Sequence, residues 1–456
     1  MMKNRTQKVT SIILTILIIA QCFIFSGCLS NNTIKIMDNS GNLILSLNSM
    51  SDNQIILKDN EYRAYLEIVL SEAEQIISEI LNCDIKQARD CMINEGYVIY
   101  TAFDKEIYSC IENAYNEQQS DELSFGCAVT DLKGTLLAAF SEGSDEHEYI
   151  NYAVKNTPPY SSFKPLSVYT PAIENNLINW STMYEDSPVK NIIGSDGQYR
   201  EWPVNSTGTY SFENASIATA IKESLNTVAV KCLQTLGVKQ SFAFLKENFD
   251  LTLEFEQNKA ALQGDEEVLG NVALGYLYDG VSPVDMAGYY QVFANGGIYN
   301  QPRSIVKICD GQGNAIYELE NPNIRIIKES TAFIVNKLLQ EVVSYGGTGE
   351  KARCNDVVVG GKTGTGDEGN WFVGFTPQYS CAIWHGKQIP KNHAAEIFST
   401  VVSSFEDNEK KDFFGCSDIK KAVYCCESGM LLSEKCFKID MGYYATDGIP
   451  DICNKH

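Results

Sequence analysis

Hydrophobic residues recur along the chain at two different periods, and the change of period separates helical from sheet-forming segments. Between positions 61 and 81 the apolar residues keep the i, i+3, i+4, i+7 spacing of an amphipathic helix with one face on a core. The segment GYVIYTAFDKEIYSCIENAY alternates first and then returns to the helical spacing, with Asp104 placed as an N-terminal cap. This pattern predicts a helix, a strand and a second helix.

Sheet-forming patterns occur in stretches that lie far apart in the sequence. The apolar runs SFGCAVT and TLLAAF are joined by Asp131-Leu132-Lys133-Gly134, whose glycine suits a tight hairpin turn. Positions 160 to 297 are mostly helical in pattern, and strand patterns return at RSIVKICDGQGNAIYEL and DVVVGGKTGTGDEGNWFVGFTPQYSCAIWHG. Strands at both ends with helices between them predict an α/β or α+β domain that is closed by pairing of distant strands.

The first thirty residues have the features of an export signal. Lys3, Arg5 and Lys8 precede an apolar run over 12–25, and small residues follow it. The tetrapeptide FSGC resembles a lipobox, with Cys28 as the lipidated residue, and an uncleaved N-terminal anchor is the alternative. Both interpretations place residues 29–456 at the cell membrane, on its extracytoplasmic face.

Composition narrows the function classes. A chain of 456 residues has room for two or three domains and a large core. Its 36 Lys and Arg against 58 Asp and Glu give a net charge of −22, which argues against nucleic-acid binding.

The cysteines and histidines are scattered. Fifteen cysteines show no paired Cys-x-x-Cys spacing, so we assign no metal site and interpret most of them as buried thiols. In CCESGMLLSEKC, either Cys425 or Cys426 could form a disulfide with Cys436, a pairing that depends on the redox state of the compartment. The four histidines fit neither a metal site nor a Ser-His-Asp triad, and we assign them no role.

Candidate chemistry starts in the stretch NTPPYSSFKPLSVYT, where Ser161 precedes Lys164 by one helical turn at a predicted helix start. Side chains three residues apart share a helix face, so a nucleophilic hydroxyl and a basic amine can meet there. By itself this pair is a weak signal, because a helix cap and a solvated lysine have the same spacing. Two later fragments strengthen it: ESLNT contains Ser224-x-Asn226, and GGKTGT contains Lys362-Thr363-Gly364-Thr365.

In this order, the three fragments resemble the motif set of penicillin-recognising serine acyltransferases. The chain resembles the transpeptidase domain of penicillin-binding proteins, most closely that of the bifunctional class A enzymes. FGCAVTDLKGTLLAAF, EWPVNSTGTYSFENASIATAIKESLNTVAV, NWFVGFTPQYSCAIWHG and CCESGMLLSEKC contribute to the resemblance, which covers roughly residues 85 to 440. It implies a penicillin-binding/serine β-lactamase-like fold: an antiparallel sheet flanked by helices, plus a helical subdomain and a small N-terminal linker domain.

The resemblance also implies roles for the motif residues. Ser161 would attack the carbonyl of a D-Ala-D-Ala stem peptide, and Lys164 would accept its proton. Lys362 is the neighbouring cation that helps to depress the pKa of Lys164. Ser224 would relay the proton to the departing amine, and Asn226 would hold a substrate amide. No cofactor is expected.

Substrate binding is carried over in the same way. The backbone N–H groups of Ser161 and Thr365 would form the oxyanion hole. Gly364 would let the substrate backbone approach the strand closely. The hydroxyls of Thr363 and Thr365, with the charge of Lys362, would bind the terminal carboxylate that the peptide and penicillin share.

The sequence departs from the family pattern at three points. Tyr160 stands where glycine is usual before the nucleophile, which would narrow the entrance, and Gly366 extends the third motif with another small residue. The glycosyltransferase domain expected upstream in a class A enzyme is missing, so the chain should cross-link glycan strands without polymerising them. A separate glycosyltransferase is therefore an expected partner.

Five parts and three functions are expected. The parts are a signal peptide or membrane anchor (1–27), a tether (28–60), a small linker domain (61–118), the penicillin-binding transpeptidase domain (119–410) and a C-terminal tail (411–456). The first function is a D,D-transpeptidase acting on peptidoglycan stem peptides, with D,D-carboxypeptidase activity if water replaces the acceptor amine. The alternatives are a β-lactam or muropeptide sensor or scaffold without turnover, and a serine β-lactamase, for which no deacylating base is evident in the sequence.

Overall fold

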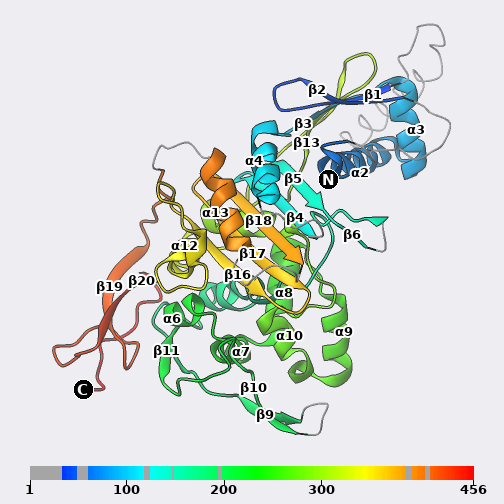
Figure 1. Cartoon of the computed structure of the whole chain (residues 1–456). Helices are drawn as coiled ribbons and strands as arrows, with labels where there is room; N and C mark the ends of the chain where they lie inside the picture. Colours follow the sequence, from blue (N-terminus) through cyan, green and yellow to red (C-terminus); the bar gives the residue numbers. More distant parts are fainter. Residues whose placement is uncertain are drawn as a thin grey trace, which may run out of the picture. The chain divides into compact units, whose positions relative to one another are not determined.

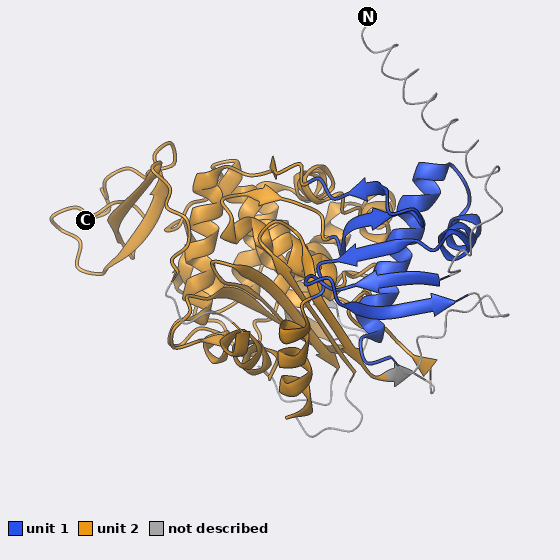
Figure 2. Cartoon of the chain, turned by 90° about the horizontal axis from the view of Figure 1, so that it is seen from above, with its two compact units in different colours: residues 1–103, 303–320 blue, residues 104–302, 321–456 orange. Residues whose placement is uncertain are grey.

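The computed structural model describes residues 33–48, 60–117, 124–145, 148–193, 198–386, 393–405 and 411–456. The export signal with Cys28 lies outside them, as do residues 28–32 and 49–59 of the expected tether. No helix in these ranges is both long enough and apolar enough to cross a membrane. The chain forms two compact units, residues 1–103 with 303–320 and residues 104–302 with 321–456 (Figure 2).

The first unit is built on a five-stranded sheet in the order β14-β13-β3-β1-β2. Its strands are β1 (Thr33–Met37), β2 (Leu43–Asn48), β3 (Val98–Thr101), β13 (Ile305–Cys309) and β14 (Ala315–Glu318), and its helices are α2 (Arg63–Leu81) and α3 (Ile85–Glu95). The predicted amphipathic helix is confirmed, because its apolar stripe, including Tyr65, Leu66, Val69 and Ile77, is buried along α2. Strands β13 and β14 join this sheet from a distant part of the sequence.

The second unit contains the predicted antiparallel sheet, in the order β16-β17-β18-β4-β5 (Figure 1). Its strands are β4 (Phe125–Asp131), β5 (Leu136–Glu142), β16 (Gly360–Thr365), β17 (Gly369–Phe375) and β18 (Tyr379–Gly386). The predicted turn between β4 and β5 is confirmed, since Gly134 adopts a φ of 83° there. Strand β18 pairs with β4, so the sheet closes through strands from opposite ends of the domain, and β16 forms one edge of it.

Helices cover both faces of this sheet. Helices α4 (Lys105–Asn116) and α13 (His393–Phe405) pack on one face, and α11 (Pro283–Ala294) and α12 (Glu329–Val343) pack on the other. The alternation of β17 shows the two faces, because Phe372 contacts Phe398 of α13 and Phe375 contacts Phe293 of α11. The aromatic residues of β17 therefore belong to the core.

The predicted helical region is mostly helical. It contains α5 (Thr170–Glu174), α6 (Ile217–Lys222), α7 (Asn226–Leu236), α8 (Val238–Phe249), α9 (Glu254–Gln263) and α10 (Leu269–Leu274). Short paired strands interrupt it: β8 (Met183–Glu185) with β11 (Asn214–Ser216), and β9 (Lys190–Ile193) with β10 (Tyr199–Trp202). Towards the end of the chain, β19 (Ile419–Cys425) pairs with β20 (Ile439–Ala445).

Candidate active site

Ser161 lies in the first turn of a helical segment, as predicted. The segment opens with a 3₁₀ turn over Tyr160–Phe163, continues as a π-helical turn over Pro165–Tyr169 and ends with α5. The edge strand β16 packs against the 3₁₀ turn. A Cβ atom at Gly364 would lie 2.4 Å from the carbonyl oxygen of Pro159. The turn that carries Ser161 therefore leaves no room for a side chain at position 364. This requirement for glycine is separate from the close approach of the substrate backbone that was expected from the sequence.

The two small departures from the family pattern, Tyr160 and Gly366, are parts of one arrangement. Tyr160 has a φ of 50°, a left-handed conformation that explains why glycine is usual at this position. Its N–H donates to Gly275, and its hydroxyl accepts a hydrogen bond from the N–H of Glu368. A Cβ at Gly366 would lie 2.0 Å from the Tyr160 ring, so the extra glycine makes room for that ring. Tyr160 and Tyr276 then pack edge to face beside Ser161.

Lys164 is fully buried, which excludes the alternative of a solvated lysine. Its Nζ donates to the carbonyl oxygen of Ser224 at 2.9 Å and to Oδ1 of Asn226 at 2.7 Å, and Ser224 Oγ lies at 3.4 Å. A neutral amine has two N–H donors and one lone pair, so the two carbonyl acceptors use both donors and leave the lone pair for a hydroxyl proton. Burial and then the nearby charge of Lys362 hold the pKa of Lys164 well below its usual value.

Ser224 joins the two lysines. Lys362 is also fully buried, and its Nζ donates to Ser224 Oγ at 2.9 Å and to the carbonyl oxygen of Thr363 at 3.2 Å. Burial lowers the pKa of Lys362 to about 7. Among the described residues, no hydrogen bond of Lys164 goes to Ser161; the amine is held by the second motif instead.

The second motif lies at the junction of two helices. Ser224 follows α6 with a φ of 59°, and Asn226 begins α7. The Nδ2 of Asn226 donates to the carbonyl oxygen of Val204 at 2.7 Å, while its Oδ1 accepts from Lys164. The side-chain amide therefore orients the base, and its second N–H is left for a substrate group.

Asp186 supports this junction, and the sequence analysis did not identify it. Its buried Oδ1 accepts hydrogen bonds from Asn205 Nδ2 at 2.7 Å and Thr227 Oγ1 at 2.6 Å. Asn205 Oδ1 in turn accepts the backbone N–H of Asn226 at 2.8 Å. Burial opposes the charge of Asp186, but the hydrogen bonds from Thr227 and the Ser211 backbone outweigh it and lower its pKa. An Asp-x-Pro sequence indicates only a turn, so no sequence signal marked Asp186.

These residues surround a pocket of about 430 Å³. Its lining includes five of the predicted residues: Ser161, Ser224, Asn226, Thr363 and Thr365. Lys164 and Lys362 lie buried behind this lining, in contact with Ser224. Tyr160, Tyr276 and Thr348 also line the pocket and were not predicted to bind substrate.

The edge strand presents a backbone donor beside Ser161. The N–H of Gly366 bonds to Gly369 of the neighbouring strand. Because N–H groups alternate in direction along a strand, the N–H of Thr365 points to the open edge. Strand β16 lies against the serine-bearing turn at that edge. This is the placement that an oxyanion donor needs.

A serine at a helix start, a buried amine with a lowered pKa and an edge strand with an outward N–H are the features of serine acyltransferases that use lysine as the base. A family model for the penicillin binding protein transpeptidase domain matches residues 99–400. The chain belongs to this family.

Relatives and solved structures agree with this assignment. The chain is 30% identical over 352 residues to penicillin-binding protein 1A of Clostridium botulinum strain Hall, covering 71% of this chain and 41% of that protein. It is 27% identical over 359 residues to penicillin-binding protein 4 of Bacillus subtilis strain 168, covering 73% of this chain and 54% of that protein. The chain thus spans less than two thirds of these relatives.

The fold matches penicillin-binding proteins of known structure. Penicillin-binding protein 1A of Haemophilus influenzae gives a TM-score of 0.67 at 15% identity, over 86% of this chain and 77% of that one. PonA1 of Mycobacterium tuberculosis, in complex with penicillin V, gives a TM-score of 0.62 at 20% identity, over 76% of this chain and 94% of that one. These likenesses confirm the predicted fold class.

Proposed function

We propose that the protein is a peptidoglycan D,D-transpeptidase that forms an acyl-enzyme on Ser161, binds penicillin covalently and works at the extracytoplasmic face of the cell membrane. The observation that carries the proposal is the buried Lys164 amine, which donates to two carbonyl oxygens of the second motif and has a cation beside it. Such an amine loses its own proton more readily than an ordinary lysine, and in its neutral form it can take the proton of a serine. Family membership supports the choice of substrate.

The chemistry follows from the placement of each group. Ser161 Oγ forms a bond to the carbonyl carbon of the penultimate D-Ala while its proton passes to Lys164. The negative oxygen of the tetrahedral intermediate is held by the N–H groups of Ser161 and Thr365, donors of a kind that contributes several kcal/mol. The C–N bond then breaks, and Ser224 carries the proton to the departing amine of D-Ala. An acceptor amine, or water in the carboxypeptidase reaction, takes the acyl group and regenerates Ser161.

Substrate selection rests on the third motif. Lys362 and the hydroxyls of Thr363 and Thr365 form a site for the terminal carboxylate of the stem peptide, a group that penicillin also carries. Asn226 offers its second amide N–H to the peptide backbone. Tyr160 and Tyr276 form an aromatic wall beside the scissile bond.

The test is a time course with fluorescent penicillin on the full chain, followed by assay of D-Ala release from a stem pentapeptide. We expect a persistent adduct that Ser161→Ala abolishes, and D-Ala release that depends on the same serine. Ser206→Ala is the matched control, because Ser206 lines the same pocket but is exposed and outside the three motifs. Loss of the label with drug hydrolysis would indicate a β-lactamase instead. A stable adduct without D-Ala release would indicate a sensor.

A further inference from the structure

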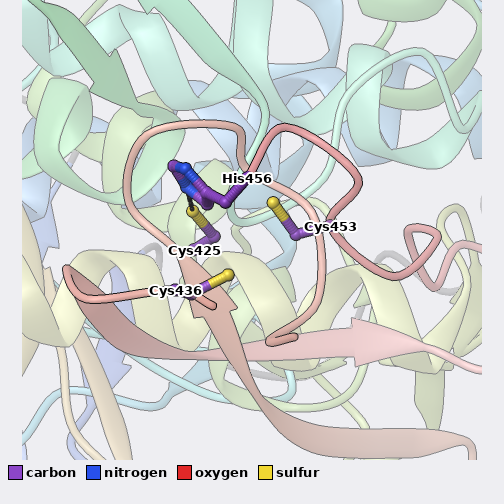
Figure 3. Close-up of side chains that lie close together, drawn as sticks. All are labelled: Cys425, Cys436, Cys453 and His456. Atoms are coloured by element: carbon purple, nitrogen blue, oxygen red, sulfur yellow. Dashed lines mark hydrogen bonds between the residues drawn. The ribbon is translucent and has the colours of Figure 1, made fainter. Parts of the chain in front are cut away.

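Four side chains near the end of the chain converge on one point that the acyl-transfer chemistry does not use. Cys425, Cys436, Cys453 and His456 each bring a donor atom to within 4.8 Å of the other three (Figure 3). None of them lines the pocket beside Ser161. All three cysteines are free thiols, and the Cys425 Sγ lies 3.3 Å from His456 Nε2.

The local backbone explains how segments so far apart in the sequence meet. Cys425 ends β19 and begins a tight turn in which the N–H of Gly429 bonds to the Cys425 carbonyl oxygen at 2.8 Å. The N–H of Cys453 bonds to the carbonyl oxygen of Leu431 at 2.8 Å, which brings the Cys453-x-x-His456 segment alongside that turn. Backbone hydrogen bonds thus hold the ligand-bearing segments together in the fold.

The donor set and its dimensions suit one class of ligand. Zn–S bonds are about 2.3 Å and Zn–N bonds about 2.0–2.1 Å, so the donor atoms of a tetrahedral zinc site lie roughly 3.5–3.8 Å apart. Three thiols and one imidazole within 4.8 Å match this spacing and the Cys₃His composition of structural zinc sites. Soft sulfur ligands also disfavour Mg²⁺ and Ca²⁺, which bind oxygen.

A disulfide explains the cluster less well. It would use two sulfur atoms and give no reason for a third thiol and an imidazole to converge on the same point. Cys426, the other cysteine considered for pairing with Cys436, is not part of the cluster. Its backbone N–H donates to the carbonyl oxygen of Lys438. A bound cation would interact with all four electron-pair donors, whereas a disulfide would involve only two of them.

We propose that Cys425, Cys436, Cys453 and His456 bind one Zn²⁺ ion in a tetrahedral structural site. On binding, the three thiols release their protons to solvent, and each thiolate and the neutral imidazole donate one electron pair to the metal. No electron transfer is involved. The expectation of no metal site came from the lack of paired Cys-x-x-Cys spacing, which this arrangement does not need.

The surroundings of the sulfur atoms fit thiolate ligands. Ser428 Oγ donates to Cys453 Sγ at 3.2 Å, and the backbone N–H of Ser433 points to Cys436 Sγ at 3.4 Å. Hydrogen bonds of this kind orient metal ligands and stabilise their negative charge. Glu427 Oε2 lies 3.7 Å from His456 Nε2, so this carboxylate is a competing partner for the imidazole when no metal is bound.

The site has a structural task in the second unit. The turn that follows Cys425 packs on the loop before β8, where Ser181 Oγ donates to the Gly429 carbonyl oxygen at 2.6 Å. Tyr444 of β20 donates to the same Ser181 hydroxyl at 2.9 Å. A two-stranded sheet has little core of its own, and a metal supplies the missing stabilisation. Zinc would therefore secure the β19–β20 segment on the domain.

The experiment uses the full chain, purified with a reductant, stripped with a chelator and then titrated with Zn²⁺ alone. We expect one zinc per chain by elemental analysis and a higher Tm with zinc. Co²⁺ in its place should give the intense visible absorption of a tetrahedral thiolate complex. Cys453→Ser and His456→Ala should weaken zinc binding by more than the 10- to 100-fold that loss of an outer-shell partner typically causes.

Cys426→Ser is the matched control, because this neighbouring cysteine lies outside the cluster, and it should bind zinc like the wild type. The wild-type titration keeps the proposal testable if a ligand variant fails to fold. Absence of zinc uptake by the reduced, folded wild type would overturn the proposal. A disulfide among the three cysteines, found by mass spectrometry of chain purified without reductant, would also overturn it. Penicillin labelling of the same samples separates either result from a failure of the proposed enzymatic function.

Discussion

The acyl-transfer site and the Cys₃His cluster both gather side chains from distant segments, but they gather opposite kinds of groups. The buried Lys164 amine donates to the carbonyl oxygens of Ser224 and of the Asn226 side chain, so donors and acceptors are matched within the protein. In the cluster, three thiols and an imidazole bring four electron-pair donors close together. The first arrangement holds its amine with acceptors from the protein itself, whereas we propose that a metal ion completes the second. The two regions should therefore respond differently to the same perturbations.

The largest expected effect is on the base. Lys164→Gln removes the amine that takes the proton from Ser161, so acylation by penicillin should fall by about 10²–10⁴-fold, the usual contribution of a general base. Stopped-flow or gel labelling measures the rate. Lys155→Ala is the control, since this lysine is exposed, and a variant at position 164 that acylates at the wild-type rate would contradict the assignment.

Lys362→Gln should have the next largest effect, with a pH signature that loss of binding alone does not produce. The wild-type acylation rate rises with pH as Lys164 loses its proton, and the midpoint lies well below the usual lysine pKa. Removal of the neighbouring cation raises the pKa of Lys164, so the midpoint should move to higher pH. A pH–rate profile of the second-order acylation constant measures this. An unmoved midpoint would mean that the two amines do not interact.

Asp186→Asn tests whether the second motif needs the Asp186 carboxylate to hold Asn226 in position. The change keeps the size of the side chain but weakens the charge-assisted hydrogen bonds to Asn205 and Thr227. We expect acylation to fall by about tenfold, equivalent to about 1.4 kcal/mol, with an unchanged midpoint of the pH profile. Asp265→Asn, at a partly exposed aspartate in the 3₁₀ turn over Asp265–Glu267 and outside the network, should have no effect. An Asp186→Asn variant as fast as the wild type would show that Asn205 holds Asn226 without this carboxylate.

The smallest effect on catalysis should come from chelation. Removing zinc should lower the Tm of the chain. Well below the Tm, the rate of penicillin acylation should stay within about twofold of the rate with zinc, because the cluster shares no residue with the pocket. Thermal unfolding and labelling of the same sample, well below the Tm, measure both. A large fall in the acylation rate that accompanies the fall in Tm would show that the cluster and the acyl-transfer site are coupled.

The parts of the molecule that could be predicted are those marked in the sequence by residue spacing or by a known motif. The stripe along α2, the β4–β5 turn and the three motifs follow from spacing and from a resemblance, and the structure brings Ser161, Ser224 and Thr365 to one pocket. Asp186 could not be found in this way, because a buried carboxylate that accepts three hydrogen bonds has the same letter as an exposed one.

The Cys₃His cluster was missed for a different reason. Its ligands come from β19, a loop and the Cys453-x-x-His456 segment, and only Cys453 and His456 are close in sequence. Their convergence depends on the bridges around Leu431, which spacing does not encode. His456 therefore appeared as an isolated histidine.

Tyr160 and Gly366 have a consequence for how this site can change. A side chain at position 366 collides with the aromatic ring, and a glycine at position 160 leaves a hollow where the ring was. Substitutions at the two positions are therefore coupled, and their combined effect will not equal the sum of the separate ones. Because Tyr160 also lines the pocket, this pair of residues sets how much space is open beside Ser161.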